Sequence, residues 1–79
     1  MTEEPTSLQL SYKPLWKTLI DKGMRKQDLR EKAKISASTI AKLGRNENVT
    51  TTVLVRICEA LECPLGEVVE LTRVDSPSE

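Results

Sequence analysis

Residues 24–43 read MRKQDLREKAKISASTIAKL, which is the pattern of two short helices joined by a tight turn. The first helix is predicted over about residues 26–33, with Leu29 and Ala33 facing inward at helical spacing. Asp28 lies in its first turn, where a carboxylate complements the positive end of the helix dipole.

The second helix is predicted over about residues 37–43. Ser36 is a favourable N-cap for it, and Ile40 and Leu43 form its inward pair. The connection between the two helices has only two or three residues, Lys34 among them. Such a connection is too short for an antiparallel arrangement, so we predict that the helices cross steeply as a helix-turn-helix.

The outer face of the second helix starts with small residues and ends with basic ones. Ser38, Ala41, Lys42 and Arg45 follow one another at i, i+3, i+4 and i+7, and Ala37 precedes them. Small residues let a helix approach base edges in the major groove of DNA, where Lys or Arg can reach guanine acceptors or phosphates. An ordinary solvent-facing helix has a similar composition, so this face alone does not decide between the two interpretations.

Further hydrogen-bond donors surround this helix in the sequence. Lys26 and Gln27 open the preceding helix, where side chains and free N–H groups together favour a phosphate. The donors after the second helix are Arg45, Asn46, Asn48, Thr50 and Thr51. Taken together, these residues favour DNA binding over a plain solvated surface.

Three more helices are predicted around this pair. One begins at Pro14 and ends at Gly23, another follows the N-cap Thr50, and the last runs from Pro64 to about residue 71. Their expected inward residues are Leu15, Trp16, Leu19, Ile20, Leu54, Ile57, Cys58, Leu61, Leu65, Val68 and Val69. The pattern therefore predicts an all-α fold of five short helices.

The two ends of the chain differ from this helical centre. Leu8, Leu10 and Tyr12 alternate with polar residues, as in a short strand or an extended arm laid on a core. Residues 1–7 and 72–79 are polar and are predicted to be disordered tails. The predicted domain therefore covers residues 8–71.

Length and charge limit what the molecule can be. With 79 residues the chain forms one small domain, and its 12 basic and 12 acidic residues give a net charge of zero. The charges are segregated: residues 13–45 hold ten basic and three acidic residues, a net of +7, and residues 46–79 have a net of −5. The basic segment contains the predicted helix-turn-helix, so the neutral total does not argue against nucleic acid.

Several functional classes are not expected. The chain has no His, two Cys and no Gly-rich phosphate loop, so we expect no catalytic residues, no metal site and no cofactor. It has no apolar run of membrane-spanning length and no signal-peptide pattern, so we expect a cytoplasmic protein.

The quoted segment, continued through GRNENVT (residues 44–50) and LVRICEALEC (residues 54–63), resembles the helix-turn-helix of Cro/phage-repressor-type transcriptional regulators. LSYKPLWK (residues 10–17) is also similar to a subgroup of very small bacterial and mobile-element regulators, so the resemblance covers about residues 8–71. It implies a five-helix, lambda-repressor-like domain whose third helix enters the major groove.

Ala37, Ser38 and Lys42 match the positions that face bases in this family, so the resemblance implies the same role for them. Lys26 and Arg45 match positions that contact phosphates. We extend this to Thr39 among the base-facing residues, and to Gln27, Asn46, Asn48 and Thr51 among the phosphate contacts. Lys34 departs from the family pattern at a turn position that is often Gly, and a left-handed Lys34 there would carry some strain.

The leading prediction is a sequence-specific DNA-binding transcriptional regulator, a repressor, acting on double-stranded DNA as a homodimer. The fifth helix and the arm at residues 8–12 are its candidate dimer surfaces. The alternative is a protein-interaction module of the same fold that binds a larger regulator or antitoxin partner. Its surface would include Leu65, Val68 and Val69.

Overall fold

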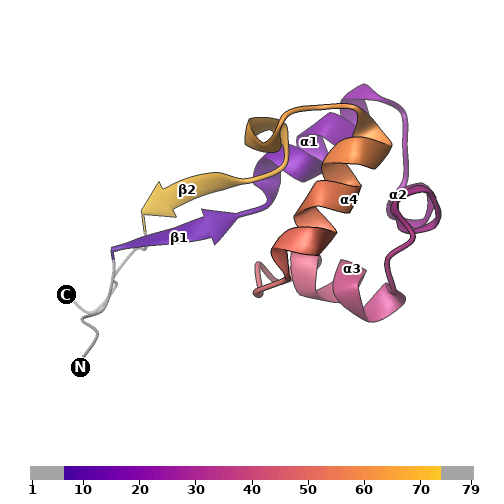
Figure 1. Cartoon of the computed structure of the whole chain (residues 1–79). Coiled ribbons are helices and arrows are strands. Elements are labelled where there is room, and N and C mark those ends of the chain that lie inside the picture. The colour runs from indigo at the N-terminus through magenta and orange to yellow at the C-terminus, as the bar shows by residue number, and fades with distance from the viewer. Residues whose placement is uncertain (1–6, 74–79) are drawn as a thin grey trace.

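The computed structural model describes residues 7–73 and contains four α-helices and one two-stranded sheet within them (Figure 1). The helices pack around a single core, and the paired strands form a ribbon that projects from it. In chain order the elements are β1 (Leu8–Ser11), α1 (Lys13–Asp21), α2 (Lys26–Ala33), α3 (Ala37–Gly44), α4 (Thr51–Leu61), the single 3₁₀ turn η1 (Leu65–Glu67) and β2 (Glu70–Arg73).

The predicted helix-turn-helix is confirmed in α2 and α3. Ser36 caps α3, its Oγ accepting a hydrogen bond from the backbone N–H of Thr39 at 3.1 Å. Thr50 caps α4 in the same way, accepting from Val53 N–H at 3.2 Å. Side-chain oxygens at these positions satisfy N–H groups that have no partner inside the helix. Figure 1 looks nearly along α2 while α3 lies across the view, so the two helices cross steeply.

Left-handed backbone conformations close the turns. Lys34 has φ 58° at the C-cap of α2, and Asn46 has φ 56° after α3. Gly23 has φ 68° beyond the end of α1, where the missing Cβ removes the steric cost. Ile35 follows Lys34 and is buried, which anchors the turn of the helix-turn-helix to the core.

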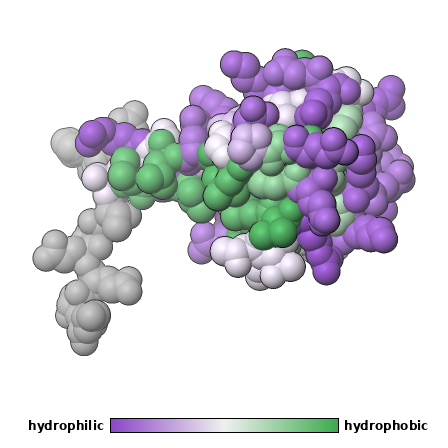
Figure 2. Space-filling model, turned by 45° about the horizontal axis from the view of Figure 1, so that its top comes forward, coloured by the Kyte–Doolittle hydropathy of each residue, from purple (hydrophilic) through white to green (hydrophobic). Residues whose placement is uncertain are grey.

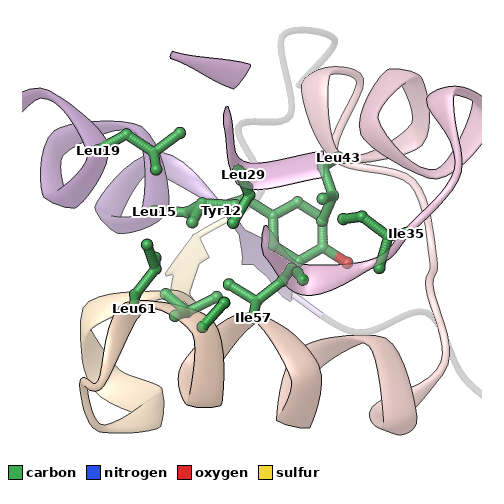
Figure 3. Packing of buried hydrophobic residues seen from close by; sticks show 11 residues of the cluster. Tyr12, Leu15, Leu19, Leu29, Ile35, Leu43, Ile57 and Leu61 are labelled. Carbon is green, nitrogen blue, oxygen red and sulfur yellow. The ribbon is translucent and has the colours of Figure 1, made fainter. Parts of the chain in front are cut away.

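The core lies where the four helices meet, and its largest fully buried side chains are Tyr12, Leu15, Leu29, Leu43, Ile57 and Val68. In Figure 3 the Tyr12 ring lies among these aliphatic side chains, between α1 and α3. Tyr12 immediately precedes α1, so the N-terminal segment contributes a central part of the core. Each of α1, α2, α3 and α4 supplies at least one fully or nearly fully buried residue.

The predicted inward position of Ile20 on α1 is wrong. Ile20 is 76% exposed, and the buried residues of this helix are Leu15, Thr18 and Leu19. These three follow the i, i+3, i+4 pattern of one helix face, which turns Ile20 about 100° away from Leu19. The buried Thr18 hydroxyl donates a hydrogen bond to the carbonyl of Glu67 at 2.8 Å and so joins α1 to η1.

The predicted fifth helix is also wrong, and with it the five-helix all-α class. The segment after Pro64 makes only the 3₁₀ turn η1 and then the strand β2. Val68 is fully buried in the core, as its inward position predicted, whereas the predicted inward position of Leu65 is wrong, because this residue of the 3₁₀ turn is 51% exposed.

The strand β2 pairs antiparallel with β1, so the predicted arm is half of a sheet. Leu10 lies opposite Leu71, and Leu8 lies opposite Arg73. β2 includes Thr72 and Arg73, which the sequence analysis assigned to the C-terminal tail. The rest of that tail, and the N-terminal tail apart from Ser7, lies outside the described residues.

The two faces of the ribbon differ in character. Opposed and alternate residues share a face, so Leu8, Leu10 and Leu71 lie together on one side with Arg73 at its end, and all four are exposed. In Figure 2 the ribbon carries an apolar surface that continues onto the helical body. Such a patch on a two-stranded ribbon, itself marginal in isolation, is typical of an interaction surface.

None of the helices in the described part of the chain combines the length and the apolarity needed to cross a bilayer.

Candidate nucleic-acid interface

The outer face of α3 is the centre of the candidate site. Leu43 is the one fully buried residue of this helix, and Ile40 is half-buried beside it. Of the predicted base-facing residues, Ala37, Ser38 and Lys42 are exposed and Thr39 is half-buried. The helix therefore rests on the core along a narrow stripe and presents the rest of its surface outward.

Three hydroxyl groups gather at the N-terminus of α3. Ser36 Oγ lies 3.0 Å from Ser38 Oγ and 2.9 Å from Thr39 Oγ1. Because Thr39 is held in this cluster, it stabilises the start of the helix as well as bordering its outer face. Ala37 carries no polar group, and it leaves this end of α3 open to close approach.

The start of α2 lies beside the start of α3. A shallow hollow of about 220 Å³ is lined by Lys26, Gln27, Arg30, Ala37 and Ile40, which brings two predicted phosphate contacts next to a predicted base-facing residue. The separate elements therefore contribute to one surface.

Lys26 is positioned by an aromatic neighbour that the sequence analysis placed in the core. Its Nζ lies 4.8 Å from the centroid of the Trp16 ring, within the range of a cation–π interaction. Trp16 is half-buried, packing against the core and also holding Lys26. Ten residues separate the two in the sequence, so no local spacing rule indicates this contact.

The loop after α3 is fixed by Tyr12. The backbone N–H of Tyr12 donates to Asn46 Oδ1 at 3.1 Å, and the Tyr12 hydroxyl donates to the carbonyl of Glu47 at 2.9 Å. Burial raises the pKa of the Tyr12 hydroxyl, which keeps it protonated as a donor. Asn46, a predicted phosphate contact, thus has its amide oxygen engaged in holding the loop in place.

Arg45, another predicted phosphate contact, is paired within the same loop. Its guanidinium binds both carboxylate oxygens of Glu47, with Nε–Oε2 at 2.7 Å and Nη2–Oε1 at 3.3 Å. The hydrogen bond from Arg45 holds the pKa of Glu47 below its usual range, and the positive charges of Arg45 and Lys42 act in the same direction. Glu47 is not among the predicted contacts. The Arg-x-Glu spacing is the signal that could have revealed it.

The remaining predicted contacts lie close in sequence to this loop. Asn48 is exposed, and Thr51 is the exposed first residue of α4, whose N-terminus follows the loop directly. Beyond the Val53 N–H that Thr50 caps, a helix N-terminus offers N–H donors and a positive dipole end to an anion. Within residues 7–73 no group of three or more Cys, Asp or Glu side chains could hold a metal ion.

The surface predicted for the alternative function, a protein-interaction module, is only partly exposed to a partner. Leu65 is exposed and Val69 is half-buried, but Val68 is fully buried in the core. An apolar groove does lie nearby, between α4 and η1, and its lining includes Leu54, Val55 and Cys58 as well as Leu65.

Comparison with known proteins places this geometry among DNA-binding domains. Residues 14–73 match the family model of the Cro/C1-type helix-turn-helix DNA-binding domain. The crystal structure of the transcriptional regulator VanUg, form II, is similar with a TM-score of 0.85 at 46% sequence identity, covering 94% of this chain and 99% of that chain. Comparison with curated proteins gives no match.

Proposed function

The chain belongs to the family of Cro/C1-type helix-turn-helix DNA-binding domains, and we propose that it is a sequence-specific, non-enzymatic transcriptional repressor that inserts α3 into the major groove. The observation that carries this proposal is the exposure of α3. This helix is capped by Ser36, anchored by Leu43 and open along the face that starts at Ala37. The similar solved structure is that of a transcriptional regulator, which supports the same role.

The residues divide into positioning and reading groups. Lys26, Gln27 and Arg45 border α3 at both of its ends and are suited to phosphate contacts, which set the register of a protein on the duplex. Lys42 can reach guanine acceptors, and the small side chains of Ala37 and Ser38 permit contact with thymine methyl groups. Few long polar side chains face the bases, so sequence-dependent DNA shape should contribute to selectivity.

We propose repression as the role because it needs only the DNA-binding core. Residues 7–73 form one core that positions α3, and occupation of a promoter is the action that such a core provides by itself. Occupation of a promoter blocks access to it and so represses transcription.

A mobility shift over a salt series tests DNA binding directly. The wild-type chain should shift duplex DNA, and log affinity should fall linearly with log salt by about 0.9 for each phosphate neutralised. Binding that does not depend on salt, or no binding to any duplex, would contradict the proposal.

We further propose that two copies bind one pseudo-palindromic operator, with half-sites roughly 34 Å apart. The apolar face of the ribbon, Leu8, Leu10 and Leu71, is the surface that we assign to the contact between copies. The rest of the chain does not suit it as a cover, because residues 1–6 and 74–79 include four acidic residues and only Met1 and Val74 as large apolar ones. A second copy offers the matching leucine face.

Leu71→Glu should therefore convert a dimer into a monomer, halving the mass measured by light scattering from twice 8.9 kDa. Leu71 is 65% exposed, so the monomer itself should keep its stability. Val55→Glu, on the 62% exposed Val55 of α4, is the matched control and should leave the dimer intact. Loss of the dimer in the α4 variant alone would assign the contact to the groove beside η1, against this account.

A further inference from the structure

The loop after α3 carries an internal competitor for one of its DNA contacts. Arg45 presents Nε and Nη2 side by side to the two carboxylate oxygens of Glu47. A guanidinium binds a phosphate through the same pair of parallel N–H groups. A phosphate and the Glu47 carboxylate therefore need the same donors, and Arg45 cannot give both of them to the two anions at once.

Glu47 is held in this position by its backbone. Its N–H donates to the carbonyl of Lys42 at 2.8 Å, and its own carbonyl accepts from the buried Tyr12 hydroxyl at 2.9 Å. The backbone on both sides of the Glu47 side chain is thus tied to α3 and to the core. This places a carboxylate beside Arg45 and in the electrostatic field of Lys42, two residues of the candidate interface.

The pair is nevertheless open to displacement. The Arg45 and Glu47 side chains are 60% and 47% exposed, and exposed ion pairs are weak in water. A phosphate approaching α3 can therefore take Arg45 from Glu47 at a modest cost in affinity.

We propose that Glu47 weakens DNA binding by occupying the phosphate-binding guanidinium of Arg45 in the free protein. This inference rests on the proposed DNA-binding function and adds a residue that limits the strength of the backbone contact. Each binding event then includes the exchange of Glu47 for a phosphate on Arg45, and the affinity measured is lower than that of an unpaired Arg45.

The test measures affinity for a fluorescently labelled duplex of random sequence by anisotropy, over a salt series. Glu47→Gln keeps the size of the side chain and removes its charge. It should tighten binding about two- to five-fold and make the log–log salt slope steeper by up to about 0.9, as Arg45 becomes fully available to phosphate. Glu47→Ala should act in the same direction.

Two further variants separate this exchange from a general charge effect. Glu62→Gln removes the same charge at the far end of α4, about 16 Å along an 11-residue helix from the end that follows the loop, and should change affinity less than Glu47→Gln. In an Arg45→Met background the gain from Glu47→Gln should disappear. Circular dichroism of each variant confirms that the helices are intact.

Three results would overturn the proposal. One is an unchanged affinity of Glu47→Gln while the wild type binds DNA, and another is an equal gain with and without Arg45. Each of these leaves the DNA-binding function standing. The third, no binding by the wild type or any variant at any salt concentration, would overturn the proposed function and this inference with it.

Discussion

Replacing Ala37 by Glu is expected to reduce affinity for duplex DNA by about 100-fold or more, without loss of folding. Ala37 is the exposed first residue of α3 and lines the hollow beside Lys26 and Arg30. A carboxylate there would enter the groove between the two phosphate backbones, and bringing like charges together at an interface costs several kcal/mol. It would also attract Lys26 and Arg30 away from the DNA.

The same substitution should not destabilise the protein without DNA, so a loss of affinity can be assigned to the DNA contact. A negative charge in the first turn of a helix interacts favourably with the dipole, so the unfolding free energy should stay equal or rise slightly. Gly66→Glu is the matched control, because it adds the same charge on η1, where a Cβ at residue 66 meets no atom within 4 Å. Equal losses of affinity in the two variants would mean that α3 is not the DNA-facing element.

Leu43→Ala is expected to have the largest effect on stability. Leu43 is fully buried, and its side chain packs α3 against the core. Truncating a fully buried Leu costs about 2–5 kcal/mol, a large part of the roughly 5–15 kcal/mol that holds a small domain folded. Urea unfolding followed by circular dichroism should show a lower midpoint, and DNA binding should weaken with the folded fraction.

Ile20→Ala is the control for this prediction. Ile20 is 76% exposed on α1, although its sequence pattern suggested an inward position. Its truncation should change the unfolding free energy by less than about 0.5 kcal/mol. A loss comparable to that of Leu43→Ala would show that Ile20 belongs to the core and would contradict its exposed position.

The features that the sequence predicted well depend on neighbouring residues. The Ser36 and Thr50 caps lie within three residues of the N–H groups they satisfy, and the inward pair Leu29 and Ala33 follows helical spacing. Such interactions are visible in a short window of sequence, so the helix-turn-helix could be located closely.

The misassigned features depend on residues far apart in the chain. β2 forms because it pairs with β1, joining Leu10 to Leu71 across some sixty residues. Within its own segment, Val68, Val69 and Leu71 fit a short helix as well as a strand. The strand state is set by the partner, which no local periodicity reveals.

In the candidate site, too, the features set by neighbouring residues were predictable and those set by the three-dimensional arrangement were not. The exposed face of α3 was predictable from spacing, and the structure places Lys26 and Gln27 beside it through a hollow shared with Ala37. The roles of Trp16 and Glu47 depend on side-chain geometry, namely a ring beneath Lys26 and a carboxylate on Arg45. The Arg-x-Glu spacing was a local signal for Glu47, whereas the use of Tyr12 to hold the loop after α3 spans thirty-five residues and had no sequence signal.

Selection of bound sequences from a pool of random duplex DNA tests the central claim most directly, namely that two copies of this fold read DNA through α3. The account predicts enrichment of a pseudo-palindrome whose half-sites lie about one helical turn apart. It also predicts that Lys42→Ala relaxes the preference at one base position in each half-site, while Lys26→Ala weakens binding to all sequences about equally. A pool that shows no enriched sequence, or an enriched motif that Lys42→Ala leaves unchanged, would contradict it.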